Sequence, residues 1–329
     1  MYNHKNLEEK VFDGPFDEVV LEVFRFQYEN NQIYRAYVDA LGKNVANIHT
    51  ADAIPFLPIR FFKTQRVITT QFDAEVVFES SGTTETTNSK HFIKDKSIYE
   101  RSFLNGFRQF YGDVKDWCIL GLLPSYLERS HSSLVYMVQQ LIEKSNHPKS
   151  GFYLYDFGQL ASVIRQLEAD KQRTLLIGVT FALLDFAEQF PMPLKYTTIM
   201  ETGGMKGRRK ELIRNEVHDY LQKAFGPQPI HSEYGMTELL SQAYSKGNGI
   251  FKSPPWMRIL IRDEDDPLTI KQSINGKARG VINIIDLANI YSCSFIATDD
   301  LGVLYEDGSF EITGRRDHSD LRGCSLLTL

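Results

Sequence analysis

The sequence has few cysteines, no long apolar run and no excess of basic residues, and each absence excludes a class of protein. The three cysteines lie far apart, which suits a reducing cytoplasm better than a disulfide framework. No apolar stretch approaches the roughly 20 residues that a membrane span needs. The net charge of −5 gives no electrostatic reason to expect nucleic acid or an anionic membrane as a partner. The N-terminal residues also lack the basic-then-apolar pattern of a signal peptide. We therefore expect a globular, cytoplasmic protein.

Short apolar runs alternate with amphipathic stretches through the middle of the chain. Runs such as "WCILGLLP", "TLLIGVT" and "KYTTIMET" predict buried strands, and apolar residues at helical spacing predict helices between them. Strands separated by helices of this length indicate a largely parallel sheet with helices on both faces, which is the α/β class. After residue 253 the strand candidates follow one another across short turns, so we expect an antiparallel β portion there. The predicted helices cover residues 97–110, 133–144, 159–170 and 210–225.

The N-terminal part has a different pattern. Residues 16–41 carry apolar side chains at three- and four-residue spacing, which predicts one long helix. The prolines of "IPFLPIRFFK" then break any helix and predict an extended connector. No flexible linker is evident between the later parts, so we expect them to pack as one body. The expected division is an N-terminal helical region and connector at 1–60, an α/β core at 61–253, a β-rich portion at 254–317 and a C-terminal tail at 318–329.

A hydroxyl-rich turn follows the first predicted strand in "FESSGTTETTNSKH". Backbone N–H groups and hydroxyls of such a turn can wrap a phosphate chain, and a glycine permits close approach. The Gly-Lys-Ser/Thr ending of a P-loop is missing, so this would be a different phosphate cradle. The alternative interpretation is a Ser/Thr-rich surface loop. The candidate phosphate-binding residues are Ser80, Ser81, Gly82, Thr83 and Thr84.

A second candidate motif is "HSEYGMTELLS". Tyr234 ends a predicted strand and can stack on a purine, and Thr237 can bond a phosphate oxygen. Glu238 supplies the hard carboxylate oxygens that Mg²⁺ prefers. Alternatively, the stretch is a simple strand-to-helix turn with Thr237 as its cap.

Two further patterns complete a possible nucleotide site. In "METGGMKGRRKEL", Gly203 and Gly204 end a strand and leave room for a flat base against the backbone. In "TDDLG" and "GRRD", Asp300 precedes Arg315. A carboxylate can accept both hydroxyls of a ribose, and a guanidinium can reach the ribose or a phosphate.

The order of these motifs resembles the adenylate-forming superfamily of acyl-CoA ligases and peptide-synthetase adenylation domains. The resemblance runs from about Phe78 to Gly323. Within it, "IPFLPIRFFK", "TGGMKGRRKEL" and "DLRGCSLL" resemble the acyl-protein synthetases, the long-chain-fatty-acid luciferin-component ligase family. This implies ATP and Mg²⁺ as cofactors. It also implies that pyrophosphate is bound by Ser80 to Thr84, and that adenine is held by Gly203, Gly204 and Tyr234. By the same resemblance, Thr237 and Glu238 bind phosphate and Mg²⁺. The ribose is held by Asp300 and Arg315.

The chain departs from the superfamily pattern in two places. Many members have glycine after the paired threonines, where this chain has Glu85. A carboxylate beside a polyphosphate disfavours binding unless it points away or meets a cation. Larger relatives also carry a mobile C-terminal domain of about a hundred residues, which supplies a catalytic lysine. The superfamily hinge falls at Asp317, and we expect that small domain to be absent here, as in the acyl-protein synthetases.

The resemblance implies an ATP-dependent acyl-protein synthetase. A fatty acid or other carboxylic acid becomes an acyl-adenylate, and a thiolate then takes the acyl group. Cys118 and Cys293 lie inside apolar runs, which favours core packing. Cys324 lies in the tail after several arginines that could lower its pKa, so it is the candidate thiol; an unreactive tail cysteine is the alternative. The acyl group would pass to a partner, an acyl reductase or an acyl carrier.

The acyl pocket is harder to read. His131 in "SYLERSHSSLVYMVQQL" could orient the substrate carboxylate, or it could be a helix cap or a surface group. Tyr136, Met137 and Phe181 could line an acyl tunnel, although core packing explains them equally well. Two other functions stay open. One is an acyl- or aryl-CoA ligase that lacks its small domain or receives it from another chain. The other is a non-catalytic nucleotide- or acyl-binding homologue, which Glu85 would suit.

Overall fold

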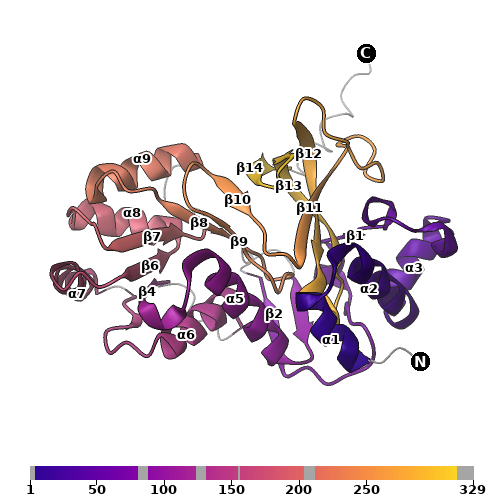
Figure 1. The fold of residues 1–329 in the computed structure, drawn as a ribbon, viewed down its shortest axis with the longest axis horizontal. Helices are drawn as coiled ribbons and strands as arrows, with labels where there is room; N and C mark the ends of the chain where they lie inside the picture. Colours follow the sequence, from indigo (N-terminus) through magenta and orange to yellow (C-terminus); the bar gives the residue numbers. More distant parts are fainter. Residues whose placement is uncertain (1–3, 81–87, 124–130, 155, 204–211, 317–329) are drawn as a thin grey trace, which may run out of the picture.

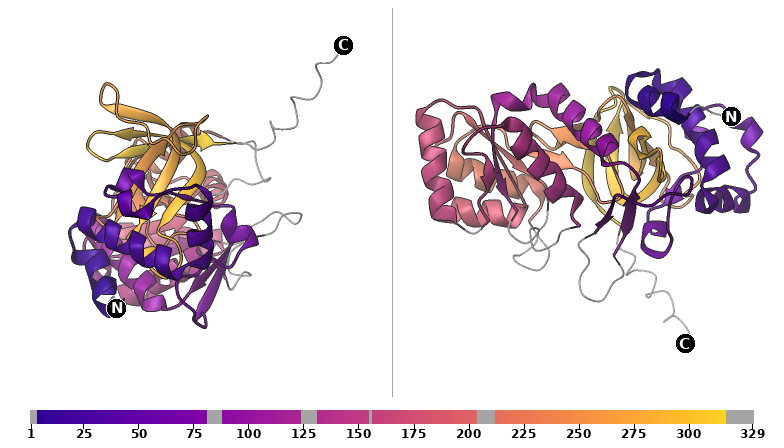
Figure 2. Two further views of the ribbon diagram at one scale, coloured as in Figure 1. Left: turned by 90° about the vertical axis from the view of Figure 1, so that its right-hand side faces the viewer. Right: turned by 90° about the horizontal axis from the view of Figure 1, so that it is seen from below.

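One twelve-stranded sheet runs through the protein (Figure 1). Its strands follow the order β11-β12-β13-β14-β10-β9-β8-β7-β6-β4-β5, and the short β1 pairs with β13 outside this path. The computed structural model describes residues 4–80, 88–123, 131–154, 156–203 and 212–316. Seen from below, the β-rich portion lies between the helix-covered half of the sheet and the N-terminal helices (Figure 2).

One half of the sheet is parallel and helix-covered. Its inner strands are buried along their whole length, because α8 and α9 lie above them and α5 and α6 below them in Figure 1. This confirms the predicted α/β class. The strands are β4 (Cys118–Leu122), β5 (Gly151–Phe152), β6 (Thr174–Gly178), β7 (Thr197–Glu201) and β8 (His231–Tyr234). The helices are α5 (Lys96–Tyr111), α6 (Ser133–Ser145), α7 (Phe157–Ala169), α8 (Thr180–Gln189) and α9 (Arg214–Phe225).

The other half of the sheet is antiparallel, as predicted for the later part of the chain. Because β10 pairs with both β9 and β14, the two halves form one continuous sheet. A separate two-stranded sheet, β2 (Val76–Glu79) with β3 (Lys90–Ile93), flanks the hydroxyl-rich turn. The antiparallel strands are β9 (Ala243–Ser245), β10 (Ile250–Lys252), β11 (Met257–Arg262), β12 (Lys277–Asp286), β13 (Phe295–Tyr305) and β14 (Phe310–Arg315).

The proline-containing connector contributes one strand and one helical turn. β1 (Leu57–Pro58) runs parallel to β13, which ties the connector to the β-rich portion. The short α4 (Phe61–Thr64) then leads toward β2. The 3-10 turns are η1 (Val45–Asn47), η2 (Ala51–Ala53), η3 (Val114–Asp116) and η4 (Leu287–Asn289).

The prediction of one long helix over residues 16–41 is wrong. The chain forms α1 (His4–Asp13), α2 (Phe16–Asn30) and α3 (Gln32–Ala40), with a break at Asn31. Asn31 has extended backbone angles, and its Oδ1 accepts a hydrogen bond from the Tyr34 backbone N–H at 3.0 Å. Its Nδ2 donates to the backbone oxygen of Ser292 at 2.9 Å. The side chain therefore starts a new helix and ties it to the segment before β13.

Replacing Asn31 with alanine should lower the free energy of unfolding by about 2–4 kcal/mol, because a helix cap and a buried hydrogen bond are lost together. Chemical denaturation measures this change. Asn44→Ala is the matched control, since the Asn44 side chain caps the exposed turn η1 by accepting from the Ala46 backbone N–H. Equal effects of the two substitutions would contradict the tethering role of Asn31.

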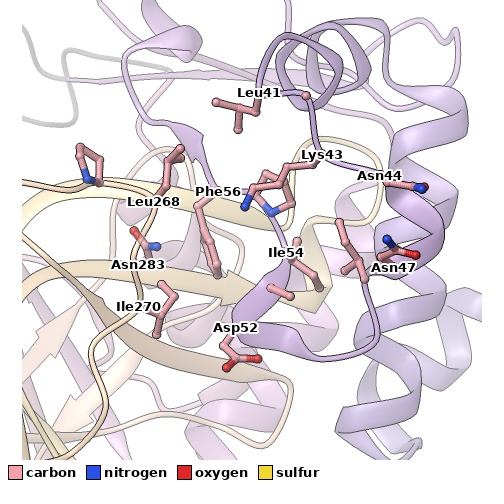
Figure 3. A pocket seen from close by; sticks show the side chains of 15 residues that line it. Leu41, Lys43, Asn44, Asn47, Asp52, Ile54, Phe56, Leu268, Ile270 and Asn283 are labelled. Carbon is pink, nitrogen blue, oxygen red and sulfur yellow. The ribbon is translucent and has the colours of Figure 1, made fainter.

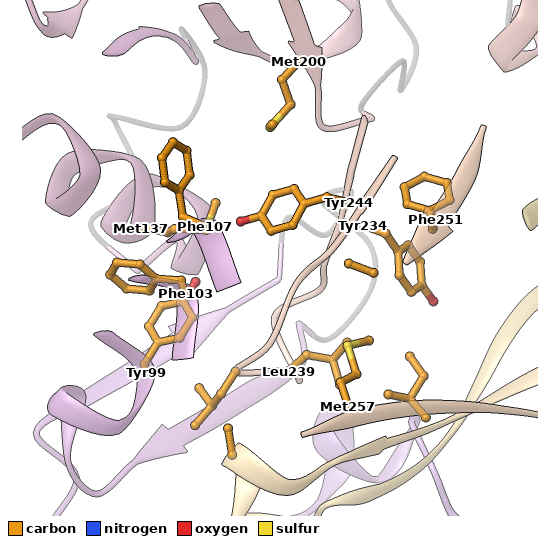
Figure 4. Packing of buried hydrophobic residues seen from close by; sticks show 14 of the residues in the cluster. Tyr99, Phe103, Phe107, Met137, Met200, Tyr234, Leu239, Tyr244, Phe251 and Met257 are labelled. Carbon is orange, nitrogen blue, oxygen red and sulfur yellow. The ribbon is translucent and has the colours of Figure 1, made fainter. Parts of the chain in front are cut away.

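Aromatic side chains from both halves of the sheet meet in one hydrophobic core. Figure 4 shows Tyr244 of β9 pointing toward Phe107 of α5 and Met137 of α6, while Phe251 of β10 lies beside Tyr234. The parts of the chain thus pack as one body, as expected from the absence of a flexible linker. Among the described helices, none combines the length and the apolar character that crossing a bilayer requires.

Candidate active site

Three predicted site residues meet at the junction of the two halves of the sheet. Tyr234 ends β8, and its hydroxyl donates a hydrogen bond to Asp300 Oδ2 at 2.7 Å. Arg315 lies directly opposite Asp300 in the β13–β14 register, with its Nε 3.7 Å from Asp300 Oδ1. The predicted ribose pair is therefore adjacent in space, and Tyr234 joins it.

Asp300 is a mostly buried acceptor next to an exposed cation. Its side chain is 16% exposed, whereas that of Arg315 is 68% exposed. Burial raises the pKa of Asp300, and the Tyr234 hydroxyl and the Arg315 charge oppose that shift. Burial and the Asp300 charge also raise the pKa of Tyr234, so its hydroxyl stays protonated and donates. The Tyr234 hydroxyl bonds Oδ2, and Oδ1 is the carboxylate oxygen that lies 3.7 Å from Arg315 Nε.

The Tyr234 ring is held by its neighbours. It packs edge-on against Phe251 and Phe310, at centroid distances of 6.0 and 5.8 Å. This packing fixes the hydroxyl against Asp300. Stacking of this ring on a purine stays a prediction.

Glu238 lies beside the two ends of the hydroxyl-rich turn. The Ser80 hydroxyl accepts from the Ser89 backbone N–H at 2.9 Å, and the Ser80 N–H donates to the Ser89 carbonyl at 3.1 Å. The Ser89 side chain in turn hydrogen-bonds the Glu238 carboxylate. Burial raises the pKa of Glu238, although this hydrogen bond opposes the shift. The other predicted loop residues lie outside the described residues: Ser81, Gly82, Thr83, Thr84 and the departure Glu85.

Two side chains that the sequence did not reveal fix the Thr237–Glu238 turn. His91 of β3 donates from Nδ1 to the Thr237 backbone oxygen at 2.8 Å. Asn289 of η4 donates from Nδ2 to the Glu238 backbone oxygen at 2.8 Å. The segment that leaves the hydroxyl-rich turn is therefore bonded to the second motif through both Ser89 and His91.

The residues after Glu238 are held by a buried carboxylate. Asp286, at the end of β12, accepts from the backbone N–H groups of Leu240 and Ser241 at 2.8 and 3.0 Å. Burial raises the pKa of Asp286 to about 6, even though these hydrogen bonds favour its charged form. Asp286 thus anchors the residues that follow Glu238, and these residues do not form a helix. The alternative of a strand-to-helix turn capped by Thr237 is therefore wrong.

His91 should make stability depend on pH. Burial lowers its pKa from 6.5 to about 4, so the unfolded chain binds the proton more tightly. The contribution of neutral His91 to the free energy of unfolding is fully present above about pH 6.5. It is lost as the pH falls toward 4, and the loss amounts to at most about 3 kcal/mol. His91→Gln keeps an N–H donor and should remove this part of the acid sensitivity. Denaturation across that pH range measures it, with the exposed His49→Gln as control; parallel curves for wild type and His91→Gln would contradict the account.

The glycine turn after β7 is shaped by a buried ion cluster. Gly203 has a φ of +76°, and a Cβ built there would meet no heavy atom within 4 Å. Glu201 accepts from the Gly203 N–H at 2.7 Å and lies 3.3 Å from Arg214 Nε. Burial would raise the pKa of Glu201, but His218 and Arg214 outweigh it and lower the pKa to about 2. The predicted role of Gly203 beside a base stays a prediction, and Gly204 lies outside the described residues.

His131 lies next to the start of the hydroxyl-rich turn. Its carbonyl accepts from the Glu79 N–H at 2.9 Å, and its side chain is exposed. The cap of α6 is Ser132 instead, whose hydroxyl accepts from the Val135 N–H at 3.4 Å. The helix-cap alternative for His131 is therefore wrong, whereas the surface-group alternative agrees with its exposed side chain. Its role toward a substrate stays a prediction.

The remaining candidates divide between the core and the C-terminal segment. Met137 and Phe181 are buried, and the Tyr136 ring stacks on Tyr99 at 6.0 Å. Cys324 and Asp317 lie outside the described residues. Cys118 and Cys293 are buried free thiols, as predicted.

In the described ranges, no group of three or more His, Cys, Asp or Glu side chains could hold a metal ion. Glu238 can offer one carboxylate. That is compatible with Mg²⁺, which proteins usually hold through one or two carboxylates together with phosphate oxygens of the substrate.

Comparison with known proteins bears on the fold. The chain is 25% identical to the long-chain-fatty-acid–luciferin-component ligase of Aliivibrio fischeri, over 94% of this chain and 86% of the relative. Its structure matches ATP-bound MatB from Rhodopseudomonas palustris with a TM-score of 0.54 at 16% identity, over 74% of this chain and 49% of that one. This chain has the fold of an adenylate-forming enzyme. The resemblance to the luciferin-component ligases is also confirmed.

A second solved structure supports the adenylate-forming fold. The ATP-bound RpMatB-BxBclM chimera B3 matches with a TM-score of 0.54 at 15% identity, over 84% of this chain and 52% of that one. The chain thus spans about half the length of these two structures. No family model matches the sequence.

Proposed function

We propose that the protein is an ATP-dependent ligase that activates a carboxylic acid as an acyl-adenylate. The observation that carries this proposal is the contact of Tyr234, Asp300 and Arg315 at the junction of the two halves of an adenylate-forming fold. The name of the Aliivibrio fischeri relative supports a long-chain fatty acid as the substrate.

In the first step, a carboxylate oxygen of the acid attacks the α-phosphorus of ATP. The bond from that phosphorus to pyrophosphate breaks, and the acid becomes a mixed anhydride with AMP. A free carboxylate is a poor electrophile, so this activation is the chemical purpose of consuming ATP. The enzyme's task is to position the reactants and to stabilise charge on the leaving pyrophosphate.

We assign the nucleotide-binding roles as follows, and the contacts of Asp300 support them. Asp300 Oδ1 accepts ribose hydroxyls, and the exposed Arg315 guanidinium reaches the ribose or a phosphate. Adenine lies against the open backbone at Gly203 and next to Tyr234. Gly204, outside the described residues, would extend that surface.

The phosphate-binding roles fall on the turn anchored by Ser80. Hydroxyls and N–H groups of Ser80, Ser81, Gly82, Thr83 and Thr84 bind pyrophosphate. Thr237 bonds a phosphate oxygen and Glu238 holds Mg²⁺, which when bound neutralises charge on the triphosphate. We assign His131 to orienting the acid, and the hydrogen bond of its carbonyl to the Glu79 N–H supports this assignment.

In the second step, a thiolate attacks the carbonyl carbon of the adenylate. The bond from that carbon to the AMP oxygen breaks, AMP leaves, and a thioester forms. We assign the thiol to Cys324, which Arg322 and the preceding arginines activate by favouring the thiolate. The thioester then passes its acyl group to a partner, an acyl reductase or an acyl carrier.

Calorimetric titration with ATP·Mg²⁺, followed by pyrophosphate release across fatty acids of different length, tests this function. We expect ATP binding and acid-dependent release of pyrophosphate. Binding without release for every acid would contradict catalysis and would favour a nucleotide-binding homologue. Acyl transfer to free coenzyme A without an acyl-enzyme would instead indicate an acyl-CoA ligase.

A further inference from the structure

Asp300 lies in an irregular part of β13. The regular pairing of β12 with β13 is interrupted at Ile282, where one residue of β12 faces three residues of β13, Thr298 to Asp300. A bulge of this kind bends its strand and turns a side chain to a direction that regular pairing does not allow. The direction of the Asp300 carboxylate therefore depends on the contacts that hold the bulge.

The Thr298 hydroxyl replaces the missing strand pairing. Backbone groups in a bulge lose their partners on the neighbouring strand, and when buried they need others. The hydroxyl donates to the Ile282 carbonyl at 2.8 Å and accepts from the Asp300 backbone N–H at 3.1 Å. Thr298 is 1% exposed, so water does not compete for these contacts. One side chain thus connects the backbone of Asp300 to β12.

Arg262 of β11 binds the same bulge. Its Nη1 donates to the Ile282 carbonyl at 3.0 Å and to Asn283 Oδ1 at 2.8 Å. Its Nη2 donates to the Thr298 carbonyl at 2.6 Å. Asn283 is itself buried, and it lies with Phe56 on the wall of a neighbouring cavity (Figure 3). A planar guanidinium therefore bridges β12 and β13, which the single nitrogen of a lysine cannot do with this geometry.

The charge of Arg262 is buried, although a buried charge is unfavourable. The residue is 6% exposed. Burial lowers its pKa to about 10, and the charge of Asp299 opposes this shift. An apolar side chain beside a regular strand pair would avoid the cost of burying a guanidinium. The irregular pairing explains the arginine, because it leaves carbonyls that need donors.

We propose that Arg262 and Thr298 are positioning residues, which hold the bulge of β13 so that Asp300 meets the ribose of the nucleotide. This inference rests on the proposed function, in which Asp300 accepts ribose hydroxyls. Both residues act through Asp300 and not on the nucleotide itself. Their loss should therefore weaken the contacts to the ribose hydroxyls and leave the contacts to adenine and phosphate in place.

Equilibrium binding of ATP·Mg²⁺ and of dideoxy-ATP·Mg²⁺, which lacks both ribose hydroxyls, tests this role without a carboxylic acid. Arg262→Gln should weaken ATP binding about tenfold and change dideoxy-ATP binding less than about twofold. Thr298→Val keeps the shape of the side chain and loses its hydroxyl, so it should also lower the preference for ATP. Thr298→Ser keeps a hydroxyl and should preserve that preference.

Arg258→Gln is the matched control, since Arg258 lies near the other end of β11 and pairs with Asp17 at 2.6 Å. Both affinities should be unaltered in this variant. Equal weakening of the two nucleotides by Arg262→Gln and Thr298→Val would indicate a structural role alone and would overturn the proposal. If Arg262→Gln does not fold, the comparison of Thr298→Val with Thr298→Ser decides.

The wild-type protein separates this inference from the proposed function. Binding of ATP by the wild type, with an unchanged preference for ATP in Arg262→Gln and Thr298→Val, would overturn the positioning role alone. A wild type that binds neither nucleotide would contradict the proposed function and the positioning role together.

Discussion

Replacing Asp300 with asparagine should lower acid-dependent ATP–pyrophosphate exchange by about 30-fold. The carboxylate accepts a hydrogen bond from the Tyr234 hydroxyl at 2.7 Å, and its other oxygen lies 3.7 Å from Arg315 Nε. Hydrogen bonds to a charged acceptor contribute about 1 kcal/mol more than neutral ones, and two ribose hydroxyls would each lose that difference. Asparagine preserves the size of the side chain and can still accept from Tyr234, so the fold should persist.

The matched control is Asp307→Asn, on the turn between β13 and β14. Asp307 is exposed, bonds Ser309 and makes no contact with Tyr234 or Arg315. Exchange by this variant should stay within about twofold of wild type. Similar exchange rates for the Asp300 and Asp307 variants would remove Asp300 from the nucleotide site.

Replacing Cys324 with serine should abolish labelling of the protein by radioactive fatty acid and ATP, while pyrophosphate exchange survives. Adenylate formation needs no thiol, whereas the acyl-enzyme does, so the two steps separate in this variant. Acid-stable labelling followed by gel electrophoresis measures the acyl-enzyme. Labelling of Cys324→Ser at the wild-type level would exclude this residue as the acceptor.

The other two cysteines serve as controls for that experiment. Burial raises the pKa of Cys118 to about 11 and that of Cys293 to about 12, so neither forms an appreciable thiolate at neutral pH. Cys118→Ser and Cys293→Ser should therefore keep the label. Its loss in either variant, with the fold intact, would point to a buried acceptor and contradict the assignment.

The parallel half of the fold is predictable because both of its faces are covered. Strands such as β4 and β6 are continuous apolar runs, and the intervening helices keep a regular apolar spacing. Helix α8 was not predicted, because seven of its residues are buried around most of its circumference and no polar face marks it. The break at Asn31 was missed because it depends on Ser292, which is far away in the sequence.

In the candidate site, too, residues of local motifs can be predicted from the sequence, whereas residues that depend on distant contacts cannot. Asp300, Arg315 and Tyr234 are recognisable because each belongs to a local motif, and the structure brings all three together. His91 and Asn289 belong to no motif. His91 bonds Thr237 across a separation of 146 residues, so only the folded chain reveals its position.

Transfer of oxygen-18 from the fatty acid to AMP tests acyl-adenylate formation most directly. The acid is labelled in both carboxylate oxygens and incubated with the protein, ATP and Mg²⁺, and the AMP is examined by mass spectrometry. If the carboxylate attacks the α-phosphorus, and a thiolate or water then attacks the carbonyl carbon, one labelled oxygen must leave with AMP. We predict AMP that carries one oxygen-18 atom. AMP without the label, or no AMP under conditions where ATP binds, would contradict the proposed reaction.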